Sequence, residues 1–291
     1  MTLIEALNAS PALLLITTTL LGLCVGSFLN VVAYRLPLMI EQEFRDACRE
    51  SFQAPPADPH EQRVSLLRPG SHCPHCKARI RPWHNLPVVG WLLLRGRCAH
   101  CSAPISAQYP VVEALTGLLS LVCAWRFGFT PQLGGALTVT WFLVALTVTD
   151  IKTMYLPDQL TLPMLWLGLL ASLLPVFAPT QAAIIGAAAG YLALWSVYWL
   201  FRLATGKEGM GYGDFKLLAA LGAWLGWAVL PQIVLLSAFV GAAVGLGLIL
   251  ARRSQWTAKL PFGPYLAGAG WIAMVFGQAI NAAYLDLAGL R

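Results

Sequence analysis

Long apolar stretches separated by short polar loops dominate the chain, and they set its expected architecture. About 20 consecutive apolar residues, each rising 1.5 Å in an α-helix, cross the hydrocarbon core of a membrane. Eight runs of roughly this kind can be counted, at about residues 11–33, 111–127, 133–150, 160–177, 181–201, 215–230, 232–251 and 262–284. The pattern therefore predicts an all-α polytopic membrane protein with about eight transmembrane helices.

Polar residues are concentrated in one long segment between the first and second apolar runs. This gives three expected parts: a transmembrane helix at 1–33, a small polar domain at 34–110 and a seven-helix membrane body at 111–291. Within the polar domain, residues 38–53 have an amphipathic pattern that suits a helix lying on the membrane or on the protein, or equally a solvated connector helix. The stretch 54–60 is rich in proline and is typical of a linker.

The composition agrees with a membrane protein, and the basic residues orient it. The chain is 58% hydrophobic and 11% charged, with a mean hydropathy of +0.67. With eight helices, 17 of the 19 Lys and Arg residues fall on one side, and ten of them lie in 34–110. Loops rich in Lys and Arg stay in the cytoplasm. We therefore expect a cytoplasmic polar domain and outward-facing termini, and the net charge of +6 requires no nucleic-acid partner.

Two aspartates are the candidate catalytic residues. Asp150 and Asp214 each stand where an apolar run meets a loop. Ionisable residues at the membrane are costly and mark functional sites. With the expected topology both face the cytoplasm, where two nearby carboxyls can share one proton. One carboxyl then accepts a proton from water while the other donates one to a peptide carbonyl, which is the chemistry of an aspartic protease.

Glycines precede the second aspartate. Gly209, Gly211 and Gly213 alternate just before Asp214 and permit close approach of another backbone. We expect Gly211 and Gly213 to contact an extended substrate, although a flexible interhelical loop would show the same pattern. The sequence is not a dinucleotide fingerprint, because it follows a membrane helix and lacks the third glycine.

Other polar residues near these runs have secondary expected roles. Asp158 is a rival catalytic carboxylate, but its position before an apolar run favours a helix N-cap. Lys152 and Lys216 each follow an aspartate by two residues, a spacing that points side chains apart on a helix. We expect both lysines to meet lipid headgroups or an acidic substrate group. Glu113, at the start of the second run, is expected to have a structural or substrate-orienting role.

Four cysteines in the polar domain have the spacing of a metal site. Two C-x-x-C pairs are separated by 21 residues, and each pair can fill two corners of a tetrahedron around zinc. Four thiolates close the metal shell, so we expect a structural zinc ion rather than a catalytic one. The alternatives are a redox dithiol, unmetallated thiols, or His75 or His100 in place of one cysteine. The expected ligands are Cys73, Cys76, Cys98 and Cys101.

Together these motifs resemble the type IV prepilin peptidases, membrane aspartic proteases of the G-x-G-D type. The resemblance spans nearly the whole chain. It rests on the two cysteine pairs and on five further segments, at 26–37, 105–113, 149–150, 156–158 and 211–216.

The resemblance implies an activity, a location and a cofactor. The substrate would be a prepilin or pseudopilin of a type IV pilus or type II secretion system, with a short basic leader that is cut off after a glycine at the cytoplasmic face of the bacterial inner membrane. Asp150 and Asp214 would be the catalytic pair. Members with the cysteine domain commonly also N-methylate the new amino terminus with S-adenosylmethionine.

Three other classes of protein are alternatives to this resemblance, and sequence features separate each of them from it. A transporter or channel would place ionisable groups at the bilayer midplane, but the apolar runs carry none there. A zinc-stabilised assembly protein without protease activity would not need the aspartate pair. A presenilin-type intramembrane protease would share G-x-G-D but not the cysteine domain. The sequence leaves the oligomeric state open.

Overall fold

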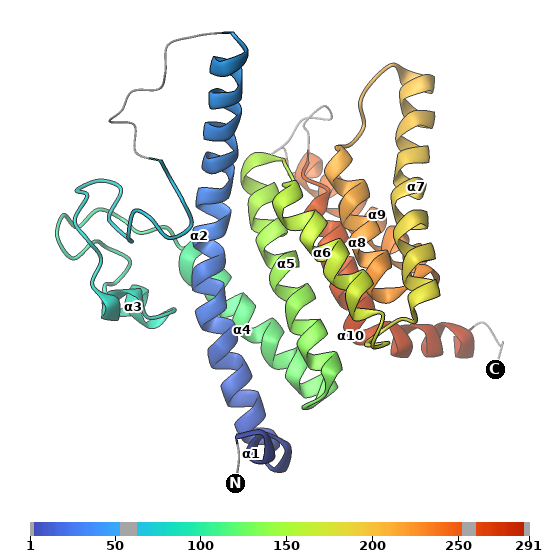
Figure 1. Ribbon diagram of the computed structural model, residues 1–291, viewed down its shortest axis with the longest axis horizontal. Helices are drawn as coiled ribbons and strands as arrows, with labels where there is room; N and C mark the ends of the chain where they lie inside the picture. The colour runs from blue at the N-terminus through green and yellow to red at the C-terminus, as the bar shows by residue number, and fades with distance from the viewer. Residues whose placement is uncertain (1–2, 53–62, 252–259, 288–291) are drawn as a thin grey trace. The chain divides into compact units, whose positions relative to one another are not determined.

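The computed structural model describes residues 3–52, 63–251 and 260–287. Contacts divide the chain into two compact units, Met1–Ala124 and Trp125–Arg291, and each is described by itself. The described residues form α-helices, short 3-10 helices and loops, with no β-strand among them, so the predicted all-α class is confirmed (Figure 1). The linker at 54–60 and most of the basic loop at 252–261 lie outside the described residues.

The first unit is built on one very long helix. After α1 (Leu3–Ala9), α2 runs from Pro11 to Ser51, and its N-cap Ser10 accepts a hydrogen bond from the Leu13 N–H. The 41 residues of α2 extend over about 60 Å, twice the thickness of the hydrocarbon core. The helix therefore continues without a break beyond residue 33, where the expected polar domain begins.

The rest of the first unit packs on α2. Short helices η1 (Pro82–Asn85) and α3 (Val89–Leu93) precede α4 (Gln108–Phe127). Small residues let α2 and α4 approach closely, because a Cβ atom on Gly26 would lie 2.8 Å from the Glu113 Cα. Farther along α2, the buried Arg35 guanidinium donates to the carbonyls of Ser65, Leu66 and Pro69.

The second unit is a helical bundle around α8. Its elements are α5 (Pro131–Thr153), α6 (Asp158–Ala171), α7 (Thr180–Thr205), α8 (Tyr212–Leu225), η2 (Trp227–Val229), α9 (Leu230–Leu250) and α10 (Gly263–Leu287). Helix α8 is buried along nearly its whole length. Glycines let its neighbours pack tightly: Gly168 of α6 faces Trp224, Gly190 of α7 faces Leu218, and Gly270 of α10 faces Leu221.

The number of membrane-spanning helices is confirmed only in part. Five helices among the described residues are long and apolar enough to cross a bilayer: α2, α4, α5, α7 and the continuous η2–α9 segment. The eight expected spans are therefore not confirmed as such. Helices α6 and α8 have 14 residues each, or about 21 Å. A helix of that length is more typical of a buried core element than of a full span.

Candidate active site and metal centre

Asp150 lies in the last turn of α5, where three segments of the chain meet. The helix ends after it because Met154 adopts a left-handed conformation. The Asp150 side chain is buried, and its Oδ2 accepts a hydrogen bond of 3.0 Å from the Gly263 N–H at the first residue of α10. A Cβ atom on residue 263 would lie 2.6 Å from that oxygen, so this approach requires glycine.

Asp214 lies in the first turn of α8, close enough to Asp150 to feel its charge. The side chain is 7% exposed, and the charge of Asp150 acts on it directly. The structure therefore brings together two carboxyls that are 64 residues apart in the sequence.

Leu156 fills the space between the start of α8, which carries Asp214, and the start of α10, which donates a hydrogen bond to Asp150. It belongs to the turn between α5 and α6 and is 4% exposed. A Cβ atom on Gly213 would lie 2.7 Å from the Leu156 Cβ, and one on Gly263 would lie 3.2 Å from the Leu156 Cδ2. Leu156 thus sets the separation between the start of α8 and the start of α10.

The two glycines expected to meet substrate have different surroundings. Gly213 is in tight contact with Leu156, so its missing side chain serves the packing of the site. Gly211 is exposed, and a Cβ atom there would lie 4.0 Å from its nearest neighbours, one of which is the Asp214 Oδ2. Gly211 therefore leaves open space beside the Asp214 carboxyl.

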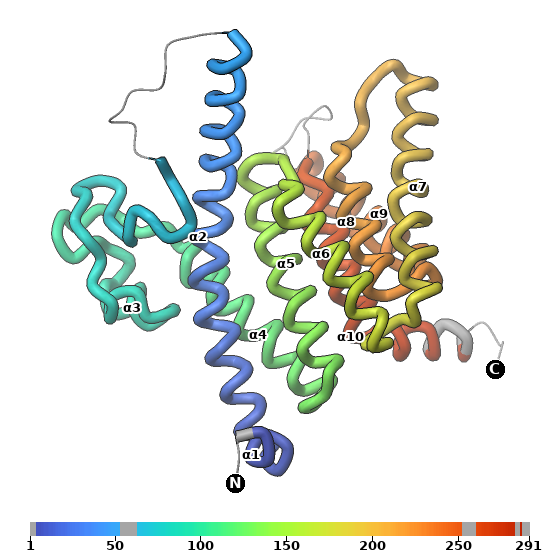
Figure 2. The backbone as a smooth tube through the Cα atoms, viewed as in Figure 1, coloured from blue at the N-terminus to red at the C-terminus, as the bar shows by residue number. Residues whose placement is uncertain are grey.

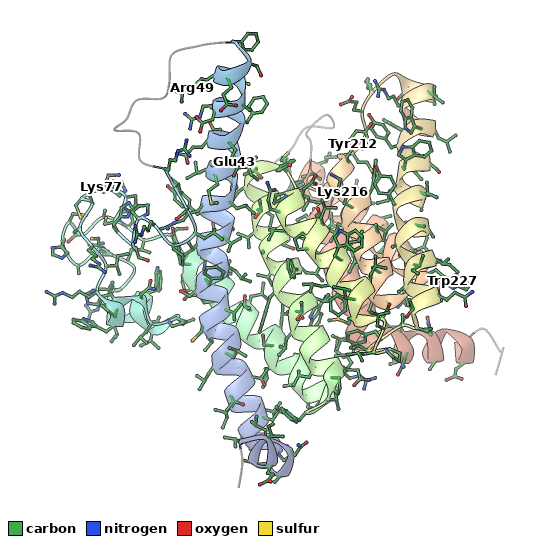
Figure 3. The ribbon with its side chains drawn as sticks, in the orientation of Figure 1. Glu43, Arg49, Lys77, Tyr212, Lys216 and Trp227 are labelled. Carbon is green, nitrogen blue, oxygen red and sulfur yellow. The ribbon has the colours of Figure 1, made fainter. Side chains whose placement is uncertain are left out.

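An ion pair joins the beginning of α6 to the beginning of α8. The Lys216 Nζ lies 2.6 Å from the Asp158 Oδ1, and both side chains are partly exposed (Figure 3 labels Lys216). The expected N-cap role of Asp158 is wrong, because Pro157 occupies the cap position and makes no side-chain cap bond. Sequence spacing along one helix could not reveal this pair, because its partners come from two different helices.

Glu113 belongs to the first unit and is used there. Its buried Oε2 accepts a hydrogen bond of 2.7 Å from the Val88 N–H, and the Ser27 hydroxyl also hydrogen-bonds this carboxylate. These contacts tie α4 to α2 and to the segment that leads into α3.

The four cysteines form one cluster in the first unit. Their Sγ atoms all lie within 4.8 Å of one another. Two sulfur pairs are separated by 3.8 Å and 4.0 Å, and four thiolates at about 2.3 Å from zinc would be about 3.8 Å apart. Among the described residues the cluster contains neither His75 nor His100. The donor set and its dimensions fit a tetrahedral metal ion.

Two equivalent turns build this cluster. In each, the carbonyl of the first cysteine accepts the N–H four residues later, and its own N–H donates to the carbonyl five residues later. The residues after the second cysteine of each pair, Lys77 and Ser102, have positive φ angles of 59° and 57°. The tight turns direct the sulfurs of each pair toward one centre.

The thiols of this cluster cannot all ionise on their own. Backbone N–H groups of Cys101 and His100 lower the pKa of Cys98 to about 6. At Cys101 the backbone of Ala103 favours the thiolate, but burial and the three neighbouring thiols outweigh it and raise the pKa of Cys101 to about 11. A bound cation would remove the mutual opposition of the four thiols to ionisation, because it stabilises all four thiolates together.

Gly263 is the site residue that the sequence did not reveal. It carries no functional group and lies 113 residues from the aspartate to which it donates. The available signal was its position in Pro261-Phe262-Gly263-Pro264, a turn-like sequence directly before an apolar run.

The chain is similar to known proteins over its whole length. The profile described as "Bacterial Peptidase A24 N-terminal domain" matches residues 20–127, and that of the "Type IV leader peptidase family" matches residues 137–246. Proteins named "Prepilin leader peptidase/N-methyltransferase" are similar over essentially their whole length. That of Stutzerimonas stutzeri is 51% identical over 100% of both chains, that of Pseudomonas aeruginosa 50% over 100% of both, and that of Aeromonas salmonicida 53% over 98% of both. No solved structure matches the chain.

Proposed function

The chain belongs to the type IV leader peptidase family, and from this premise we propose that it cleaves the leader from prepilins or pseudopilins and N-methylates the new amino terminus. The observation that carries the peptidase proposal is the meeting of Asp150 and Asp214 in one buried site. The runner-up function, a membrane assembly or transport protein without protease activity, gives no reason for two carboxyls to meet there.

In the proposed reaction the aspartate pair shares one proton. The ionised carboxyl takes a proton from a water molecule, whose oxygen bonds to the carbon of the scissile peptide. The protonated carboxyl gives its proton to the carbonyl oxygen. Collapse of the tetrahedral intermediate then breaks the C–N bond: the proton held by the first carboxyl passes to the leaving amine, and a hydroxyl proton of the intermediate returns to the second carboxyl as the C=O bond re-forms.

The surroundings of the pair suit an extended peptide. The open space at Gly211 would let a substrate backbone lie beside Asp214, while Gly213 keeps the loop close to Leu156. For Glu113, its two buried hydrogen bonds favour the structural role over substrate orientation. Gly263 and Leu156 hold the catalytic segments in place.

The proposed location is the cytoplasmic face of the bacterial inner membrane. The strong bias of Lys and Arg to one side of the expected topology supports this orientation. A prepilin is expected to be a membrane helix with a polar leader inside the cell, so carboxyls at this interface could cut without moving that helix.

Two cofactors complete the proposal. The four-cysteine cluster would hold a structural zinc ion that fixes the loops of the first unit. S-adenosylmethionine would supply the methyl group: its S–CH3 bond would break as the lone pair of the new terminal amine forms the N–C bond, the sulfur would leave as a neutral thioether, and the amine would lose a proton.

The test is mass spectrometry of a purified prepilin after incubation with the protein in lipid vesicles, with and without S-adenosylmethionine. We expect loss of the leader mass in both samples and a gain of one methyl group only with the donor. An intact prepilin in both samples would contradict the proposed peptidase activity, and cleavage without methylation would contradict the transferase activity alone.

A further inference from the structure

A strongly basic segment of the first unit has no acidic residue of its own. Residues 63–107, here called the basic module, contain seven Lys and Arg and no Asp or Glu. The module stays positive even with four thiolates around a zinc ion. All seven cationic side chains are exposed, and five of them follow the first cysteine of the cluster: Lys77, Arg79, Arg81, Arg95 and Arg97 (Figure 3 labels Lys77). Such a surface attracts an anionic partner.

The same module exposes a group of large apolar side chains. They lie within residues 83–93, here called the apolar tip, which includes most of η1 and all of α3. Exposed fractions range from 49% to 69% for Trp83, Leu86, Val89, Leu92 and Leu93. A concentration of this size on a short segment marks a surface that contacts another apolar phase or a partner.

Hydrogen bonds hold the apolar tip beside the membrane-spanning part of α2. Val88 donates to Glu113, which lies five residues inside α4, and Glu113 is also bonded to Ser27 of α2. Ser27 lies six residues before the end of the apolar run at 11–33, which is about 9 Å along the helix. In Figure 2, α3 accordingly lies beside α2 and not beyond its C-terminal end.

We propose that the apolar tip is inserted into the interfacial layer of the membrane that α2 and α4 cross, and that the exposed arginines and lysine of the basic module bind anionic phospholipid headgroups. The depth of Val88 places the tip within the membrane boundary, and the charge selects anionic lipid. Tryptophan and arginine suit this boundary because each has an apolar body and a polar end. Arg81 already stacks on Trp83, with its Cζ 5.7 Å from the ring centroid.

Other occupants fit the surface less well. A basic leader peptide would be repelled by a module that has only positive charges. A second copy of the chain would bring the same positive surface against itself. Lipid alone satisfies both the apolar side chains and the charge.

The experiment uses the full chain in vesicles of phosphatidylethanolamine and phosphatidylglycerol, with photoreactive p-benzoylphenylalanine in place of Leu93. The matched control carries the same group in place of Leu67, which is 83% exposed in the same module. The carbonyls of Ser65, Leu66 and Pro69 around it are held by Arg35, beyond the end of the first apolar run. After illumination, mass spectrometry should find phospholipid adducts at position 93 and far fewer at position 67.

A second measurement tests the role of charge. Arg95→Gln in the Leu93-substituted chain should lower the ratio of membrane-inserted to free apolar tip about five-fold. The yield of lipid adducts should fall with it. Phosphatidylcholine in place of phosphatidylglycerol should also lower adduct yield. If position 93 does not accept the probe, position 92 replaces it. Equal lipid labelling at the tip and at position 67, cross-links mainly to a second chain, or no effect of Arg95→Gln would overturn the proposal.

Discussion

At the scale of single residues, the candidate active site consists of two carboxyls and a few residues that position them. Asp150 is held by a backbone N–H, and Asp214 lies within reach of its charge. Gly213 and Gly263 allow the chain to close around Leu156. The geometry thus depends on the absence of two side chains as much as on the presence of two carboxyls.

Prepilin cleavage should be sensitive to substitution of Gly263, although this residue carries no functional group. In Gly263→Ala the new Cβ would overlap the Asp150 Oδ2 and displace the carboxyl, so we expect prepilin cleavage to fall on the order of a hundred-fold. Gly268→Ala is the control, because the same helix has nothing within 4 Å of that position. Equal rates in the two variants, measured by mass spectrometry of the product, would disprove this role.

The Lys216–Asp158 pair should affect cleavage more than stability. A partly exposed ion pair contributes under about 1 kcal/mol to folding, but this one joins the first residue of α6 to the first turns of α8, the helix that carries Asp214. We expect Lys216→Ala to lower the cleavage rate on the order of ten-fold with little change in Tm. Exchange of the charges, Lys216→Asp with Asp158→Lys, should recover part of the rate, and no recovery would point to a role of Lys216 outside the pair.

How far the sequence predicts these residues depends on their chemistry. Asp150 and Asp214 could be identified because isolated charges at the ends of apolar runs are costly. Gly263 could not, because a glycine is informative only once its neighbours in space are known. The pairing of Asp158 with Lys216 also depends on how α6 packs against α8.

At the scale of elements, apolar length predicts the long helices, whereas the spans expected at 160–177 and 215–230 are not confirmed. Hydropathy identifies α5, α7 and α9 correctly. It does not separate a helix facing lipid from one buried in protein, so α8 has the composition of a span although it forms the core of its unit. The long α2 passes its expected end because helical backbone can continue into polar residues without a break.

The four-cysteine cluster is expected to bind one zinc ion per chain. Elemental analysis of the purified protein should find it, and the double variant Cys73→Ser with Cys101→Ser should lose it together with protection of residues 72–104 from hydrogen exchange. Cys24→Ser is the matched control, because Cys24 lies in α2 and outside the cluster. A wild-type protein purified without chelators that contained no metal would contradict the assignment.

At the scale of the whole molecule, the family and the geometry support the same activity. The relatives extend over the full chain, and the contacts of the aspartate pair come from α5, α8, α10 and the turn after α5. All of these elements belong to the second unit. The long apolar helices are those of a membrane protein.

The most direct measurement is the rate of prepilin cleavage by Asp150→Asn, Asp214→Asn and the double variant, each with a Tm close to that of the wild type. When two residues act as one catalytic unit, replacing either one removes the contribution of both to the rate, so replacing the second costs little more. We therefore expect each single variant to be as inactive as the double variant, with losses of at least about a thousand-fold. Near wild-type cleavage by either single variant would contradict a catalytic centre built from both aspartates.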